Sequence, residues 1–243
     1  MKELTDWLSR LRPERIVALT GAGISAESGI PTFRTAGGLW KTFKVEELAT
    51  PEAFDRNPDV VWEWYEARRE QIRGVEPNAA HRALARLGNA DGIDLTLVTQ
   101  NVDDLHERAG SRDVLHLHGS IFRVKCVAEG IVSEGREAFA DRPPRCDCGG
   151  LLRPDVVWFG EPLDLDTLNA ASNAVERAEV LLVIGTSSVV YPAAGLAWMC
   201  RGTTVEVNPE ATPLTGFAQY TIRATASSVV PKIVSIILGE SDD

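Results

Sequence analysis

The sequence RIVALTGAGISAESG, residues 15–29, places a glycine-rich turn directly after a short apolar run. The run Arg15–Thr20 is typical of a buried parallel strand, and Gly21, Gly23 and Ala26 have the G-x-G-x-x-G/A spacing. Glycines allow a tight turn there and let backbone N–H groups approach a pyrophosphate at the start of a helix. An ordinary strand–helix turn has the same letters, but the position after a first strand favours a nucleotide site.

Other apolar runs along the chain have the length and composition of buried parallel strands. They are Asp94–Thr99, Asp113–Leu117, Val180–Ile184 and Thr203–Val207. Helical patterns cover Met1–Pro13, Pro58–Arg73, a segment capped by Asn78 that runs through Leu87 and stops at Gly88, and Ser227–Leu238. The alternation of strands and helices predicts an α/β fold with a Rossmann-like, doubly wound parallel sheet.

Two segments break this alternation. Phe122–Trp158 contains glycines, paired prolines and three of the four cysteines, and it has little periodicity, so we expect a small inserted domain. Trp40–Pro77 is typical of a helical insertion. The sequence therefore predicts a Rossmann-like domain made of residues 1–40, 78–121 and 159–243, a helical insertion at 41–77 and a small domain at 122–158.

Composition limits the classes of function. Of 243 residues, 44% are hydrophobic and 25% are charged, which is typical of a soluble globular protein. The formal net charge of −10 argues against a direct nucleic-acid binder, because phosphate neutralisation needs clustered Lys and Arg. There is no apolar run long enough to span a membrane and no secretory signal, so we expect a cytoplasmic location.

The segment after the glycine turn does not suit a simple dehydrogenase. Such enzymes carry an acidic residue at the end of a second strand about 20 residues on, and none occurs here. Instead the chain continues as Ile30–Trp40, in which glycine, proline and arginine predict a mobile loop over the cofactor. A lid of this kind would shield a reactive sugar cation from water.

Polar side chains follow two later strands. Gln100, Asn101, Asp103 and Asp104 come after the run that ends at Thr99, which is more than a helix cap needs. The carboxyl ends of strands are where doubly wound sheets bind ligands, so these residues favour a functional site.

The next strand ends in two histidines. His116 and His118 are two apart and should share a strand face. A strand histidine is usually structural, but His118 lies beside a glycine at the strand's carboxyl end. A neutral imidazole there is suited to act as a general base near pH 7. A metal pair is the alternative, although no third ligand lies nearby in the sequence.

Together these segments resemble the sirtuin family. The matching strings are Gly21–Arg34, Thr99–Asp103, His116–Gly119, Leu152–Glu161, Gly185–Ser187 and Val207–Pro209. They occur in the family's order and extend over nearly the whole chain. The resemblance implies a Rossmann-like NAD domain with a small zinc-binding insertion, and an acyl-lysine protein or peptide bound in the cleft between them.

The resemblance also implies a role for each matching position. The pyrophosphate and ribose are expected at Gly21, Ala22, Gly23, Ser25, Ala26, Glu27, Thr32, Phe33 and Arg34, with a further contact from Trp40. The nicotinamide and its ribose are expected at Gln100, Asn101, Val102 and Asp103, and the adenosine at Gly185, Thr186, Ser187, Asn208, Pro209, Glu210 and Ala226. The extended substrate peptide is expected to pair by β-augmentation with Val156, Val157, Trp158, Phe159, Gly160 and Glu161.

The implied chemistry is NAD-dependent deacylation of lysine. Nicotinamide leaves, the acyl oxygen attacks C1′ of the ribose, and His118 removes a ribose hydroxyl proton. The products are the free lysine, nicotinamide and 2′-O-acyl-ADP-ribose.

Tyr65 and Arg68, three residues apart on a predicted helix, bear on the choice of acyl group. They resemble the Tyr-x-x-Arg pair of class III sirtuins, which reads the terminal carboxylate of succinyl- or malonyl-lysine. Arg68 is able to clamp a carboxylate with two hydrogen bonds, and Tyr65 adds a third. The alternative is a surface helix with a Glu–Arg ladder that involves Glu63, Glu66, Arg69 and Glu70. Acetyl groups would still fit.

The cysteines depart from the family's zinc pattern. A structural zinc site needs four ligands, usually from two Cys-x-x-Cys-like pairs. Here the position three residues after Cys126 is Glu129, and the distal pair is Cys146 and Cys148, with Asp147 between them. Three thiolates with Glu129 or Asp147 could hold zinc, or the site has degenerated and other contacts close the loop.

Two alternative functions remain open at this point. An NAD or ADP-ribose sensor would bind without turnover, and an NAD hydrolase or ADP-ribosyltransferase would use the same sugar cation. The set of His118, Gln100, Asn101 and Asp103 favours the deacylase over the sensor. The sequence does not indicate the protein targets or the oligomeric state.

Overall fold

The computed structural model describes residues 2–32, 48–139 and 141–240. Within this part of the chain, six parallel strands form one sheet in the order β3-β2-β1-β7-β8-β9. The strands are β1 (Arg15–Thr20), β2 (Asp94–Thr99), β3 (Leu115–His116), β7 (Val180–Ile184), β8 (Thr203–Val207) and β9 (Tyr220–Ile222). The order reverses between β1 and β7, which is where doubly wound sheets bind ligands, at the carboxyl ends of the strands.

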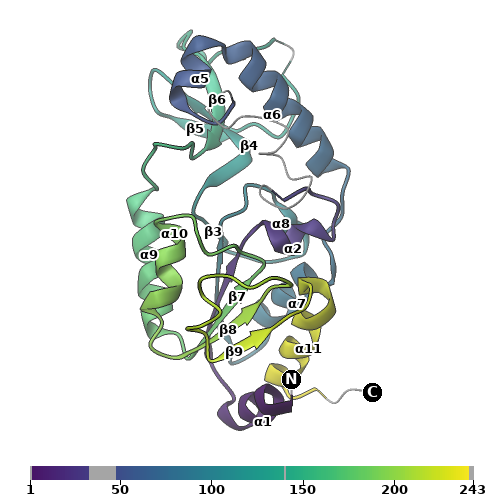
Figure 1. Ribbon diagram of the computed structural model, residues 1–243. Helices are drawn as coiled ribbons and strands as arrows, with labels where there is room; N and C mark the ends of the chain where they lie inside the picture. Colours follow the sequence, from purple (N-terminus) through teal and green to yellow (C-terminus); the bar gives the residue numbers. More distant parts are fainter. Residues whose placement is uncertain (1, 33–47, 140, 241–243) are drawn as a thin grey trace.

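Helices cover both faces of the sheet (Figure 1). One face packs against α1 (Lys2–Leu11), α7 (Ala79–Gly88) and α11 (Ala226–Leu238), and the other against α9 (Leu165–Arg177), α10 (Ala193–Leu196) and the 3₁₀ turn Ala197–Met199. Alternate residues of each central strand enter the two cores, so Ile16 and Ala18 face one and Val17 and Leu19 face the other. Burial on both faces explains why these strands are continuous apolar runs.

A second lobe lies beyond the carboxyl ends of these strands (Figure 1). In the described chain its antiparallel sheet has the order β5-β4-β6, formed by β4 (Gly119–Cys126), β5 (Val132–Glu134) and β6 (Leu152–Val156). The helices α5 (Pro51–Arg56) and α6 (Pro58–Arg73) pack on it, and Trp62, Tyr65, Val124 and Trp158 share one apolar cluster. The predicted insertions at 41–77 and 122–158 thus contribute to one core, while the predicted domain boundaries themselves stay a prediction.

Local signals set the ends of several helices. Thr50 and Asn57 accept hydrogen bonds from the first turns of α5 and α6, each of which begins with a proline. Asn78 and His81 form a reciprocal capping box at the start of α7. The predicted bounds Pro58–Arg73 of α6 are confirmed.

Some predicted bounds were wrong. The strand expected at Asp113–Leu117 contains Leu115 and His116 alone, because Asp113 has a positive φ of 51° and cannot begin an extended strand. Gly88 does not stop α7: it is the last helical residue, and Asn89 is the C-cap. The helix expected at Ser227–Leu238 starts one residue earlier, at Ala226.

No helix in residues 2–32, 48–139 and 141–240 is both long enough and apolar enough to cross a membrane.

Candidate active site

A cavity of about 830 Å³ lies between the two lobes, over the point where the strand order reverses. Its wall on the sheet side is made by the turn after β1 and the turn after β7, which touch each other. Gly21 N donates to the Ile184 carbonyl at 3.0 Å, and Gly23 N donates to the Gly185 carbonyl at 2.7 Å. A Cβ atom at Gly23 would lie 2.7 Å from Gly185 Cα, so this approach requires glycine.

Most of the predicted cofactor-binding residues line this cavity. The described ones are Gly21, Ala22, Gly23, Ala26, Glu27, Thr32, Gln100, Asn101, Val102, Gly185, Thr186, Ser187, Asn208, Pro209 and Glu210. Phe33, Arg34 and Trp40 lie outside the described residues. Ser25, Asp103 and Ala226 are not in the lining, and their predicted contact with a cofactor stays a prediction.

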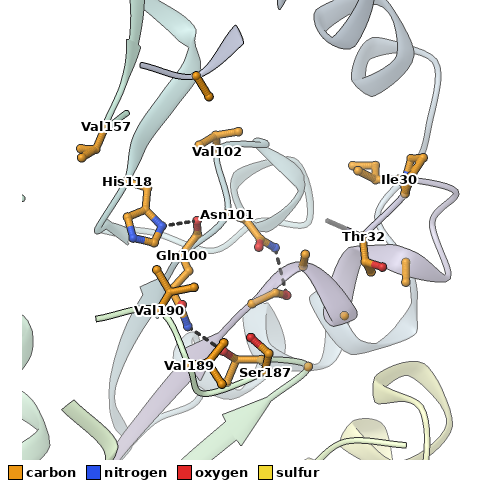
Figure 2. Close-up of a pocket in the computed structure, with 18 of the residues that line it drawn as sticks. Ile30, Thr32, Gln100, Asn101, Val102, His118, Val157, Ser187, Val189 and Val190 are labelled. Atoms are coloured by element: carbon orange, nitrogen blue, oxygen red, sulfur yellow. Dashed lines mark hydrogen bonds between the residues drawn. The ribbon is translucent and has the colours of Figure 1, made fainter. Parts of the chain in front are cut away.

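Amide side chains connect the loops of the cavity wall (Figure 2). Gln100 Nε2 donates to Thr186 Oγ1 at 3.0 Å, and Asn208 Nδ2 donates to the Thr186 carbonyl at 2.7 Å. Asn101 Nδ2 donates to the Gly21 carbonyl at 3.3 Å. The loops that follow β1, β2, β7 and β8 are therefore held together before any ligand binds.

His118 lines the cavity from the connection between β3 and β4. Its Nδ1 lies 2.9 Å from the Gln100 carbonyl oxygen (Figure 2). A carbonyl only accepts hydrogen bonds, so Nδ1 carries the hydrogen and the lone pair is on Nε2. Burial lowers the pKa of His118, against a smaller raising effect of the Gln100 hydrogen bond, so the ring is neutral at pH 7.

The other strand histidine has a different environment. His116 Nε2 lies 2.6 Å from Glu107 Oε1 and its Nδ1 lies 3.2 Å from the Asn101 carbonyl. Burial lowers the pKa of His116, but the Glu107 carboxylate outweighs it and the net shift is upward. His116 is not part of the cavity lining, and only the histidine at 118 is placed to act there.

A buried polar chain lies behind the lining. Ser25 Oγ donates to Asp103 Oδ2 at 3.0 Å and accepts from Asn101 Nδ2 at 3.2 Å. His81 Nε2 lies 3.4 Å from Ser25 Oγ. Because His81 Nδ1 accepts from Asn78 N, its Nε2 carries the hydrogen, and the bonds around Ser25 are mutually consistent. Burial raises the pKa of Asp103 to about 6.

Sequence reasoning missed His81. Its signal was the spacing of three residues from Asn78, which is that of a capping box. The partnership with Ser25 brings together residues 56 positions apart and could not be inferred from local sequence.

Tyr65 and Arg68 both line the small-lobe side of the cavity. Trp158 Nε1 donates to Tyr65 Oη at 2.9 Å, and the Arg68 guanidinium lies over the Trp64 ring at 5.4 Å. Burial raises the pKa of Tyr65 to about 12 and lowers that of Arg68. A Glu–Arg ladder also exists on α6, where Glu66 pairs with Arg69 and Arg73, and Arg73 also pairs with Glu70, while Arg68 lines the cavity.

The segment Val156–Glu161 forms the rim of the cavity. Arg153 makes two hydrogen bonds to Glu161, at 2.6 and 2.8 Å, and stacks on Trp158. Val157 N donates to the His118 carbonyl and Phe159 N to the Ala49 carbonyl, both at 3.0 Å. Those donors are engaged within the chain, so strand pairing with a peptide, which stays a prediction, would use other backbone groups of the segment.

Other parts of the cavity wall were not predicted. Gly29, Ile30 and Pro31 also line the cavity and belong to the predicted Gly21–Arg34 region. The residues missed are Ala49, Trp64, Leu163, Val189, Val190, Tyr191, Pro192, Ala211, Thr212, Pro213 and Thr225. The segment 189–192 follows the β7 turn, and its place after a strand end was the available signal. Tyr191 is 71% exposed, so it offers an apolar surface at the rim.

The cysteines of the small lobe come together away from this cavity. Ligand atoms of Cys126, Glu129, Cys146 and Cys148 all lie within 4.8 Å of one another. Three thiols and one carboxylate in this space match the donor set and size of a structural zinc site. The described residues therefore fit a metal, with Glu129 where the family pattern has a further cysteine.

Fold and cavity define a nucleotide-binding protein of the doubly wound class with a second lobe over the sheet's carboxyl edge. A profile of the Sir2 family, the sirtuins, matches residues 21–192, and the chain belongs to this family. It is 53% identical over 229 residues to the NAD-dependent protein deacylase of Thermococcus kodakarensis, an alignment that covers 90% of this chain and 89% of that protein. It is 50% identical over 230 residues to that of Mycobacterium tuberculosis, covering 90% and 96% of the two chains.

Solved structures show the same fold. A Sir2 homologue in complex with ADP-ribose is 48% identical, has a TM-score of 0.91, and covers 96% of each chain. A Sir2 homologue in complex with NAD is 48% identical at a TM-score of 0.90, covering 98% of this chain and 94% of that one. A Sir2–p53 peptide–NAD complex is 33% identical, with a TM-score of 0.84 and 97% coverage of both chains.

Proposed function

We propose that this chain is an NAD-dependent protein-lysine deacylase in which His118 is the general base. The observation that carries this assignment is the hydrogen bond of His118 Nδ1 to the Gln100 carbonyl. It fixes the tautomer in which Nε2 accepts, and burial keeps the ring neutral, in a cavity whose sheet side has the glycine turns of a dinucleotide site. Relatives named as NAD-dependent protein deacylases, and the Sir2 homologue solved with NAD, support the proposal.

NAD would bind across the touching turns after β1 and β7. The pyrophosphate would lie against backbone N–H groups near Gly21 and Gly23, and the adenosine beside Thr186 and Asn208. The nicotinamide end would then point toward Gln100, on the side of the cavity where His118 lies.

In the proposed reaction, the bonds change within NAD and the acyl-lysine, and His118 transfers a proton. Nicotinamide leaves, the acyl oxygen bonds to C1′, and Nε2 of His118 takes the proton of a ribose hydroxyl. That hydroxyl oxygen attacks the imidate carbon, and water later releases free lysine and 2′-O-acyl-ADP-ribose. The protein contributes the base, the positions of the reactants and a dry environment.

We further propose that the enzyme accepts acidic acyl groups, through Tyr65 and Arg68. Arg68 is 6% exposed and lines the cavity wall, where a bidentate bond to a carboxylate is strong. Trp158 Nε1 donates to Tyr65 Oη, which leaves the tyrosine's own hydrogen to be given to another acceptor. A succinyl or malonyl carboxylate is such an acceptor.

The test is a parallel assay of acetyl-, malonyl- and succinyl-lysine peptides with NAD, read by mass spectrometry. A deacylase yields nicotinamide and acyl-ADP-ribose in equal amounts, and His118→Ala should abolish both while NAD still binds. Binding of NAD without turnover would indicate a sensor instead. Free ADP-ribose or ADP-ribosylated protein in place of acyl-ADP-ribose would indicate a hydrolase or a transferase. Full activity of His118→Ala would overturn the assignment of the base.

A further inference from the structure

The metal-binding turns of the small lobe are built around an unusual donor set. One turn follows β4 and contains Cys126 and Glu129, and the other contains Cys146 and Cys148. Neither turn lines the cavity, so any role of this cluster is separate from the chemistry proposed above.

Two donor separations in the cluster match those of a tetrahedral zinc site, and all the ligand atoms lie within 4.8 Å of one another. Zinc bonds to thiolate at about 2.3 Å and to carboxylate oxygen at about 2.0–2.2 Å, which puts neighbouring donors roughly 3.5–3.8 Å apart. Cys126 Sγ lies 3.5 Å from Cys148 Sγ, and Cys146 Sγ lies 3.8 Å from Glu129 Oε2.

The backbone holds both turns in shape independently of a metal. Gly130 N donates to the Cys126 carbonyl and Gly149 N to the Cys146 carbonyl, each at 2.8 Å. Both glycines have positive φ, 72° and 85°, which other residues rarely adopt. A Cβ at Gly150 would lie 2.9 Å from Ala128 Cβ and 3.2 Å from Cys148 Sγ, so a side chain there would force the two turns apart.

We propose that Glu129 is the fourth ligand of a zinc ion held by Cys126, Cys146 and Cys148. The sequence alone left Glu129 and Asp147 as equal candidates, and the geometry chooses between them. The Glu129 carboxylate joins the cluster of mutually close donors, whereas Asp147 is exposed and belongs to no such group among the described residues.

The carboxylate should determine the affinity of the site for zinc and its absorption spectrum with cobalt. Oxygen is a harder donor than thiolate and binds zinc less strongly in a sulfur-rich site, so this centre should exchange its metal more readily than one with four thiolates. We expect Glu129→Cys to bind zinc roughly tenfold or more tightly than the wild type, and Glu129→Ala roughly tenfold or more weakly.

The experiment uses the full chain, stripped of metal with a chelator and titrated with Co²⁺ and then with competing Zn²⁺. Thiolate-to-cobalt charge-transfer bands count the sulfur donors, and competition gives the relative affinity for zinc. The wild type should show three sulfur donors and Glu129→Cys four. The control Asp147→Asn should match the wild type in both measurements.

Two results would overturn the proposal. One is a Glu129→Ala protein that matches the wild type in both spectrum and affinity. The other is a wild-type chain that binds neither metal in the micromolar range. Circular dichroism of each variant, and rescue of metal binding in Glu129→Cys, separate the loss of a ligand from a failure to fold.

Discussion

The imidazole of His118 owes its proposed role to one hydrogen bond and to burial. The bond to the Gln100 carbonyl fixes the tautomer, and the low-dielectric surroundings lower the pKa. A lowered pKa means that the accepting Nε2 is lost only when the pH falls below the ordinary range of histidine.

The acidic limb of the pH–rate profile should reflect this shift. We expect kcat/KM for NAD to stay constant as the pH falls through about 6.5, the ordinary histidine value, and to decline only below it. The measurement is the rate of acyl-ADP-ribose formation at low NAD between about pH 5 and pH 8. A midpoint above the ordinary histidine value would contradict the assigned environment of the ring.

Arg68 should discriminate between acyl groups. In Arg68→Met, a thioether of similar length replaces the guanidinium, so the bidentate bond to a terminal carboxylate disappears. We expect kcat/KM for succinyl-lysine peptide to fall about 100-fold or more and that for acetyl-lysine peptide to change by less than about fivefold. Glu63→Gln, on the same helix but outside the cavity lining, is the matched control. Equal losses on both peptides would count against the clamp.

Trp158 should act through Tyr65. Trp158→Phe keeps an aromatic ring in the apolar cluster but removes the donor to Tyr65 Oη. Without that donor, the tyrosine O–H is no longer oriented toward the substrate carboxylate. We therefore expect kcat/KM for succinyl-lysine peptide to fall roughly three- to tenfold relative to that for acetyl-lysine peptide. Tyr65→Phe should lower the ratio of kcat/KM for succinyl-lysine to that for acetyl-lysine peptide by a similar factor. The double variant should show no further loss. Additive effects would show that the two residues act separately.

Among the elements, the turns after β1 and β7 are the most constrained. Gly23→Ala would place a methyl group 2.7 Å from Gly185 Cα, and backbone on both sides leaves little room to yield. We expect NAD affinity to fall roughly tenfold or more and stability to fall by about 1–3 kcal/mol. Gly216→Ala is the control, because a Cβ there meets nothing within 4 Å. Calorimetric titration with NAD and urea unfolding measure the two effects.

Helix α7 contributes an acid-sensitive group. Burial lowers the pKa of His81 to about 4, while the unfolded chain takes up the proton near pH 6.5. Stability from this group is therefore present above pH 6.5 and lost as the pH falls toward the folded value. In His81→Gln the amide keeps the capping bond but does not titrate. Between about pH 7.5 and pH 5, the free energy of unfolding of the variant should therefore fall by about 2 kcal/mol less than that of the wild type. Urea unfolding at both pH values checks this, and equal losses would contradict the shift.

The sequence predicted elements well where burial repeats in a simple period. The central strands are apolar on both faces, so β1, β2, β7 and β8 could be placed to the residue. The short edge strand β9 and the strands of the small lobe, with mixed burial, could not. The cavity lining at strand ends was predictable from topology, whereas the buried set of Ser25, His81 and Asp103 required long-range contacts.

At the scale of the molecule, the cavity lies between two lobes that have separate apolar cores. Residues of the sheet's two faces make up two apolar clusters, and α5, α6 and the small sheet share a third. The connection at His118 leads from one lobe to the other, so the proposed base lies between the proposed NAD side and the proposed acyl side of the cavity.

Cys126 and Cys146 connect the proposed acyl side of the cavity to the cysteine cluster, because both contact the same apolar cluster. Cys126 is 1% exposed and belongs to the same apolar cluster as Tyr65 and Trp158, although its sulfur also lies among the proposed zinc ligands. A change in coordination would therefore be transmitted through close-packed side chains to the groups that we propose read the acyl chain. Removal of zinc should then reduce the ratio of kcat/KM for succinyl-lysine to that for acetyl-lysine peptide before it reduces the affinity for NAD.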